Sequence, residues 1–247
     1  MRRDPGELAR ELERRLRAAG DPARAAAQQA YLKSGMPFAG VPVPVTRRIV
    51  RDLLRAGPEL LPADAAALAR ALWQRGLFEC RLAATMVLAG RARQLRAEDA
   101  GLIEALIRDS GTWALVDVLA ASVMGPLAER EPGLGATLDR WAADPDFWVR
   151  RSALLALLGP LRRGAGDFAR FSRYADAMLG EREFFIRKAI GWVLRDTGRR
   201  RPGLVAGWLA PRIRQVSGVT LREALKPLPP ETARQLLAAR GQPAPAR

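Results

Sequence analysis

The sequence predicts an all-α fold, and three observations point to it. Ala, Leu and Arg, which favour helices, dominate the chain, and segments with the β-branched and aromatic pattern of strands are nearly absent. Gly and Pro recur every 10 to 20 residues or so, as expected for short helices joined by tight turns. Similar segments also recur at a nearly constant interval, which indicates a repeat architecture.

Taken in order, the helical pattern begins close to the N-terminus and continues to the end of the chain. Asp4-Pro5, Asp21-Pro22, Thr46 and Pro230-Glu231 are predicted to start helices, because these residues cap helices or fit their first turn. The predicted helices cover 5–19, 22–33, 45–57, 63–75, 77–93, 97–108, 112–128, 132–143, 146–161, 166–179, 183–198, 200–211, 219–227 and 230–240.

One clear loop interrupts this pattern, from Met36 to Pro44. Its prolines are expected to prevent a helix there. We expect the loop to connect the first helical pair to the rest of the chain without separating domains. The prediction is therefore a single domain over 1–247, with a disordered tail at about 241–247.

Four segments resemble one another and define the repeat. They are Phe78–Ala84, Thr112–Val118, Phe147–Ala153 and Phe184–Ile190, and their first residues are 34, 35 and 37 positions apart. This period suits a two-helix repeat of the HEAT or armadillo kind. The predicted fold is a right-handed α-α solenoid of HEAT-like repeats, curved, with a basic concave face lined by the second helices.

The sixth position of this alignment singles out one carboxylate. Three repeats place a small residue there, Ala83, Ser152 and Ala189, whereas the remaining repeat has Asp117. At the second position aromatic residues gather, with one exception: Glu79, Trp113, Trp148 and Phe185. The fourth and fifth positions are basic: Arg81, Arg150, Arg151, Arg187 and Lys188. Arginines in register with aromatic rings would bind phosphates beside sugars or bases.

The charge balance also indicates a polyanionic partner. The chain has 41 basic and 26 acidic residues and a net charge of +15. Nucleic acid is the first interpretation, an anionic membrane surface the second, and a general solubility effect the third. No segment has the roughly 20 apolar residues needed to cross a bilayer, and the charged N-terminus does not resemble a secretory signal.

Several kinds of chemistry are excluded by composition. The chain has no histidine, which removes catalytic triads and most zinc or iron sites, and we find no metal cluster, phosphate loop or nucleotide motif. We therefore expect no metal and no cofactor. Cys80, the single cysteine, is compatible with a reducing cytosol.

Individual candidates have both a functional and a structural interpretation. Trp113 and Asp117 share a helix face, either as an aromatic wall beside a catalytic carboxylate or as an interior Trp with a solvated Asp. Trp192 lies in an apolar run and suits a core position, although the adjacent Gly191 suggests a close approach of backbone or ligand.

The basic candidates are equally open. Arg150 and Arg151 point about 100° apart on a helix, so one is expected to face a ligand while the other flanks it or forms an ion pair. A stripe on the third predicted helix either contacts phosphates or is a solvated face, and Tyr31 with Lys33 gives a weaker signal for backbone contact. The stripe consists of Arg47, Arg48, Arg51 and Arg55.

These residues resemble the bacterial AlkD-like DNA alkylation repair enzymes, which are HEAT-like-repeat alkylpurine DNA glycosylases. The resemblance rests on Thr112–Asp117, Phe147–Ala153 and Glu183–Arg195, with weaker support from Ala30–Lys33 and Leu221–Ala224. It covers nearly the whole chain. One departure is that the family's Trp-Trp-Asp before the catalytic Asp is here Thr112-Trp113-Ala114.

The resemblance implies hydrolysis of the N-glycosidic bond of positively charged N3- or N7-alkylpurines in duplex DNA, without deep base flipping. It assigns catalysis to Asp117, Trp113 and Trp192, and a phosphate contact to Arg151. Asp117 would stabilise a sugar cation and orient water, while the two Trp rings pack on the deoxyribose. We expect a monomer acting on the bacterial nucleoid in the cytoplasm. Two alternatives stay open: a non-catalytic protein that recognises damaged or branched DNA, and a helical-repeat scaffold for proteins.

Overall fold

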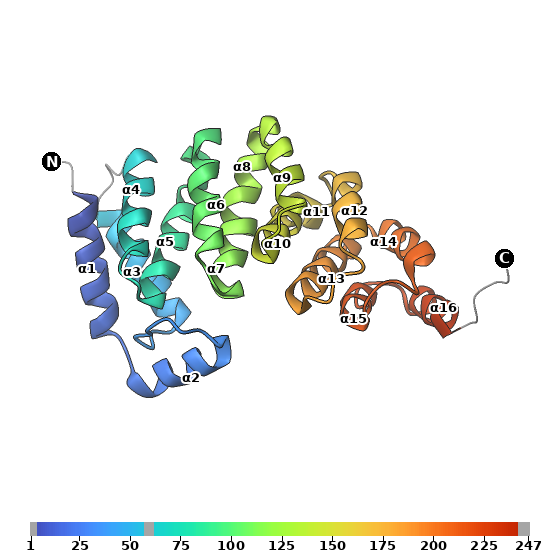
Figure 1. Cartoon of the computed structure of the whole chain (residues 1–247), viewed down its shortest axis with the longest axis horizontal. Coiled ribbons are helices and arrows are strands. Elements are labelled where there is room, and N and C mark those ends of the chain that lie inside the picture. Colours follow the sequence, from blue (N-terminus) through green and yellow to red (C-terminus); the bar gives the residue numbers. More distant parts are fainter. Residues whose placement is uncertain (1–3, 57–61, 242–247) are drawn as a thin grey trace. The chain divides into compact units, whose positions relative to one another are not determined.

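The computed structural model describes residues 4–56 and 62–241, and within these ranges it is helical without any strand, which confirms the predicted all-α class (Figure 1). By its internal contacts the chain forms two compact units, unit 1 over 1–131 and unit 2 over 132–247, each described here by itself. The single domain over 1–247 stays a prediction. Of the expected disordered tail, 242–247 lie outside the described residues, and Gly241 ends the last helix.

Unit 1 is a stack of short helices whose neighbours in sequence pack side by side. α4 packs against α1 and α5, and α5 also contacts α3 and α7. The elements are α1 (Pro5–Ala18), α2 (Pro22–Leu32), α3 (Val43–Ala56), α4 (Pro62–Trp73), α5 (Phe78–Gly90), η1 (Ala92–Gln94), η2 (Ala97–Asp99), α6 (Ala100–Arg108), α7 (Trp113–Val118), the π-helical segment η3 (Leu119–Met124) and α8 (Gly125–Arg130).

Unit 2 repeats the same arrangement. α9 packs on α10, and the second helices of successive repeats follow one another, α10 against α13 and α13 against α15. The elements are η4 (Pro132–Leu134), α9 (Gly135–Ala142), α10 (Phe147–Ala156), α11 (Leu158–Arg162), α12 (Phe168–Ala177), α13 (Phe184–Gly198), α14 (Pro202–Leu209), η5 (Ala210–Arg212), α15 (Gly218–Leu225) and α16 (Pro230–Gly241).

The helix α2 stands apart from the stack of unit 1 (Figure 1). None of its residues is buried, although Asp21 caps it by accepting hydrogen bonds from the amides of Ala23 and Arg24 at 2.9 and 3.2 Å. Two glycines allow the N-terminal end of α2 to lie close to the following loop. A Cβ on Gly40, whose φ is +80°, would lie 2.0 Å from the Asp21 carbonyl oxygen, and a Cβ on Gly20 would lie 2.4 Å from that of Ala39. Close backbone packing therefore fixes α2.

The start of α3 corrects two sequence predictions. The loop ends at Pro42, and Pro44 lies inside the first turn of α3, where its missing N–H has no helical partner to lose. Thr46 is not a cap, because it is fully buried within the helix and its hydroxyl donates to the Pro42 carbonyl at 3.4 Å. Residue 57, the predicted end of this helix, lies outside the described residues.

Several predicted helices are divided, for example 77–93 into α5 and η1, and proline explains two of the breaks. The predicted helix over 112–128 becomes α7, η3 and α8, and the one over 146–161 becomes α10 and α11. Pro126 and Pro160 cannot donate to the carbonyl four residues earlier and would clash with it, so the preceding turn widens or ends. Both prolines occur in a Gly-Pro-Leu triplet, and the triplets are 34 residues apart.

That interval also corrects the alignment of the repeats. Thr112 caps α7 from outside, so the helix begins at Trp113, in register with the first residues of the other second helices. All four are aromatic: Phe78, Trp113, Phe147 and Phe184. In this register Asp117 corresponds to Leu82, Arg151 and Lys188 and not to Ala83, Ser152 and Ala189. The three small residues are fully buried, as predicted for positions where helices pack closely.

The single cysteine lies in the core of unit 1. Cys80 is fully buried on α5, and burial raises the pKa of its thiol to about 12. No helix among the described residues has the length and hydropathy needed to cross a membrane.

Candidate nucleic-acid interface and active site

The carboxylate singled out by the sequence lies on α7 of unit 1. Asp117 and Trp113 are one helical turn apart, and both are partly exposed, while Leu115 and Val116 between them are buried. The Thr112 hydroxyl accepts a hydrogen bond from the Ala114 amide at 3.5 Å and so starts the helix. The π-helical segment begins two residues after Asp117, at Leu119, and such segments are frequent at functional sites.

A second aromatic ring meets Trp113 from α2. The rings of Tyr31 and Trp113 form a T-shaped pair, with centroids 6.2 Å apart and planes at 84°. Tyr31 is 74% exposed, so most of its ring faces solvent. Lys33 ends α2 in the left-handed conformation with φ of 49° and is exposed. The structure thus places Tyr31, a weak candidate by sequence, in contact with Trp113, the aromatic residue on the helix of Asp117.

A hollow of about 490 Å³ opens beside these residues. Its lining is apolar except for Arg47 and Ser122, and it includes Trp113 together with the residue after it, Ala114. The other lining residues are Val43, Phe78, Leu82, Met86, Ala89 and Val118. An apolar wall with a cation at its margin suits a sugar or base carrying a phosphate. Arg48, also predicted to bind, is exposed on α3 but does not line the hollow.

In unit 2, Trp192 is held by its own helix. Its indole Nε1 donates to the Asp196 carboxylate at 3.2 Å, and Arg162 binds the same carboxylate at 2.6 Å. The neighbouring Gly191 lies where α13 meets α15, and a Cβ there would lie 2.9 Å from the Glu223 Cβ. The close approach expected at this glycine is therefore between two backbones of the fold.

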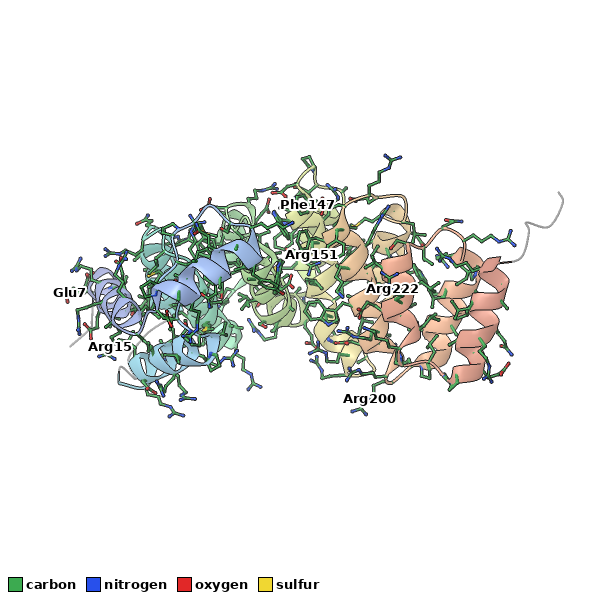
Figure 2. The ribbon with its side chains drawn as sticks, turned by 90° about the horizontal axis from the view of Figure 1, so that it is seen from below. Glu7, Arg15, Phe147, Arg151, Arg200 and Arg222 are labelled. Atoms are coloured by element: carbon green, nitrogen blue, oxygen red, sulfur yellow. The ribbon has the colours of Figure 1, made fainter. Side chains whose placement is uncertain are left out.

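The adjacent arginines of α10 have different surroundings, as their directions on the helix predict. Arg150 pairs with Glu181 at 2.8 Å, and this carboxylate raises the pKa of the Arg150 guanidinium further above its usual value. Arg151 is only 3% exposed, and its guanidinium donates to the Phe185 carbonyl and lies 5.9 Å from that ring. Figure 2 shows Arg151 one turn along α10 from Phe147.

The two basic candidates of α13 also have partners within the fold. Arg187 donates to the Glu181 carbonyl at 2.6 Å. Lys188 binds the Glu223 carboxylate at 2.8 Å, which Lys226 contacts at 2.9 Å and Arg195 also binds. These cations, Lys188 foremost, lower the pKa of Glu223 to about 2. Each side chain keeps part of its surface exposed, so their predicted contact with DNA stays a prediction.

Trp148 belongs to an aromatic cluster at the starts of α10 and α13. Its ring lies 4.4 Å from that of Phe147 and 4.9 Å from that of Phe185, and Phe184 touches Phe185 at 5.5 Å. Phe184 is 53% exposed. The sequence alignment with its shifted register missed Phe147 and Phe184 as matching partners of Trp113, and the Gly-Pro-Leu spacing could have found them.

The positive charge is divided unevenly along the chain. The segment 132–247 has 21 basic and 10 acidic residues, whereas 1–131 has 20 and 16. Unit 2 therefore contributes most of the attraction for a polyanion.

Comparison with known proteins decides the family. The DNA alkylation repair enzyme family matches residues 12–228. The chain belongs to that family. As a DNA alkylation repair enzyme it has DNA as its partner and a role in DNA repair. A sequence comparison with curated proteins gives no significant match.

Two solved structures have a similar fold. A predicted DNA alkylation repair enzyme from Enterococcus faecalis matches with a TM-score of 0.75 and 23% identity, over 84% of this chain and 95% of that one. The protein smu.31 from Streptococcus mutans UA159 matches with a TM-score of 0.50 and 16% identity, over 81% and 97%. At these identities the likeness shows the fold alone.

Proposed function

We propose that this DNA alkylation repair enzyme is a glycosylase that releases N3- and N7-alkylpurines, such as 3-methyladenine and 7-methylguanine, from duplex DNA. The observation that carries the proposal is the position of Asp117, one turn from Trp113 and on the helix that lines an apolar hollow. The family assigns DNA repair, and a carboxylate next to aromatic rings suits chemistry on a sugar cation.

The reaction needs little from the protein because the lesion is already activated. An alkyl group on N3 or N7 gives the base a positive charge, so breaking the bond from C1′ to the purine nitrogen returns an electron pair to the ring and neutralises it. Water then adds to C1′ and loses a proton, which leaves an abasic site and a neutral alkylpurine. No histidine is required to protonate the leaving base.

In this mechanism Asp117 stabilises the positive charge that develops on the sugar and accepts the proton of the attacking water. Trp113 offers a π face to the same charge, and its ring forms a T-shaped pair with Tyr31. Trp192 has the corresponding role from α13 by resemblance to the family. The base stays outside a deep pocket, in contrast to enzymes that extrude it. We further propose that the protein acts as a monomer on the nucleoid of the bacterial cytoplasm.

A single assay tests the proposal. Purified protein is incubated with duplex DNA that contains 7-methylguanine, and released base is measured by chromatography. Asp117→Asn should lower the rate by about 100-fold or more, because the variant keeps the shape and loses the charge. Glu98→Gln, at an exposed carboxylate of the same unit that does not line the hollow, is the matched control and should keep full activity. Absence of release by the wild type, or full activity of Asp117→Asn, would refute the proposal.

The second candidate is a non-catalytic DNA-binding relative. Two of the basic candidates in unit 2, Arg150 and Lys188, form ion pairs within the fold, which favours a structural over a catalytic role for them. This second candidate predicts that wild type and Asp117→Asn both bind damaged duplex in a salt-dependent way and that neither releases the base.

A further inference from the structure

A second hollow in unit 1 lies next to the one beside Trp113. It has a volume of about 310 Å³ and is lined by four arginines, of which three lie one turn apart on α3 and the fourth follows the end of α5. They are Arg47, Arg51, Arg55 and Arg91. The remaining lining residues are apolar or glycine: Val50, Leu54, Met86 and Gly90.

Among the described residues, the four guanidinium groups of this hollow have little acidic charge beside them. None of the described residues lining the hollow is acidic. Arg51 pairs with its neighbour Asp52 at 3.7 Å, and both side chains are about half exposed. Like charges four residues apart destabilise a helix by a few tenths of a kcal/mol per pair. A surface that gathers them around a hollow is suited to an anion with several charges.

We propose that this arginine hollow binds the phosphates of the DNA backbone that flanks the lesion. The proposal rests on the proposed function and adds to it the path of the DNA on unit 1. Guanidinium groups bind phosphate oxygens through two parallel hydrogen bonds, and they are charged at every physiological pH. The apolar floor of Val50, Leu54 and Met86 lets a sugar-phosphate chain lie close without competing acceptors.

Continuity between the two hollows gives the direction of the path. Arg47 and Met86 line both of them, so they form one surface along α3 and α5. A DNA strand whose sugar meets Trp113 at one end of this surface would pass Arg47 and reach Arg51, Arg55 and Arg91 at the other. The contact is with the backbone and is therefore independent of base sequence.

The experiment compares two charge-matched triple variants. The first, Arg51→Gln with Arg55→Gln and Arg91→Gln, removes the hollow and leaves Arg47 at the Trp113 site. The control, Arg10→Gln with Arg70→Gln and Arg93→Gln, removes the same charge from exposed positions of unit 1 outside both hollows. Thermal melting checks folding, and the first variant should melt no lower than the wild type because a repulsion is relieved.

Binding is measured by fluorescence anisotropy with undamaged duplex at several salt concentrations, so the readout does not depend on catalysis. Each lost phosphate contact lowers the slope of log K against log salt by about 0.9. The hollow variant should therefore lose two to three units of slope and bind roughly 100-fold more weakly near 0.15 M salt. The control variant should differ much less from the wild type.

A series of duplexes shortened from one end then locates the contact. Wild-type affinity should fall when the flank that reaches the hollow is removed, and the hollow variant should not respond to this truncation. Equal slopes for both triple variants, or equal responses of wild type and hollow variant to truncation, overturn the inference and leave the proposed function standing. A wild type that binds no DNA at all overturns both.

Discussion

Removal of the Glu79 carboxylate should release the loop after α2 and so increase the mobility of α2, the helix that carries Tyr31. Glu79 is fully buried on α5 and accepts three backbone hydrogen bonds from the loop after α2, from the amides of Ala39, Gly40 and Val41 at 2.9, 2.8 and 3.1 Å. The amides of Gly40 and Val41 are buried. Because α2 buries none of its own residues, this loop determines where Tyr31 meets Trp113.

The size of the effect follows from the three bonds. In Glu79→Ala two buried N–H groups lose their acceptor, at about 1–3 kcal/mol each, and the third becomes dependent on water. The loss should total about 3–5 kcal/mol, as for other broken buried charged networks. Glu79→Gln keeps an oxygen for Gly40 and Val41 but turns an N–H toward that of Ala39, so it should lose only one bond, about 1–3 kcal/mol.

Amide hydrogen exchange gives the local readout. The amides of Ala39, Gly40 and Val41 and the helix α2 should lose protection in the order wild type, Glu79→Gln, Glu79→Ala. Thr85→Ala is the control, since its buried hydroxyl on the same helix donates to the Leu82 carbonyl and does not touch the loop. Equal protection of these amides in Glu79→Ala and wild type would refute the reasoning. Equal losses of protection in Glu79→Ala and Glu79→Gln would show that the hydrogen bonds accepted by the carboxylate oxygens do not hold the loop in place.

Two further predictions concern close packing and pH. Gly40→Ala should lower the free energy of unfolding by about 2 kcal/mol or more in a denaturant titration, because φ is +80° and the new Cβ would lie 2.0 Å from a carbonyl oxygen. Gly76→Ala is the control and should lower it by about 1 kcal/mol, since φ is +69° there but no atom lies within 4 Å of the new Cβ. Equal losses of stability in the two variants would contradict this prediction. Glu223, whose pKa is lowered to about 2 by Lys188, Lys226 and Arg195, should contribute about 3 kcal/mol above pH 4.5 that disappears as the pH falls toward 2. Melting curves at pH 7 and pH 3 should differ less for Glu223→Gln than for the wild type.

The course of the helices was predictable from local signals. Capping by Asp4 and Asp21 occurs as expected, and most predicted helices are present. Errors arose where the effect of a proline depends on its place in the helix. Pro44 is harmless in a first turn, whereas Pro126 and Pro160 interrupt second helices that have an unbroken apolar pattern.

The register of the repeats shows a different limit. Aligning Thr112 with aromatic residues shifted one repeat by a single position, because the sequence alone does not distinguish the residue that caps a helix from the first residue within it. Correcting the shift replaces the small buried counterparts of Asp117 by Leu82, Arg151 and Lys188. It leaves Asp117 the one carboxylate at its position.

Tertiary contacts account for what the sequence could not indicate. Tyr31 and Trp113 are far apart in the chain, so no periodicity relates them. Glu79 was an unexplained exception among aromatic residues, and its partners lie about 40 positions earlier. Arg91 gave no signal at all, since it joins the arginines of α3 only when α5 packs beside them.

The inert thiol of Cys80 makes the protein convenient to label. Reagents such as maleimides react with thiolate, and a buried thiol whose pKa is about 12 forms almost none at neutral pH. The native cysteine can therefore stay in place while new ones are introduced at exposed positions. Gln94→Cys in unit 1 and Arg222→Cys in unit 2 would accept a donor and an acceptor dye. Single-molecule energy transfer between the two dyes would then report changes in the distance between the two labelled positions as DNA is added.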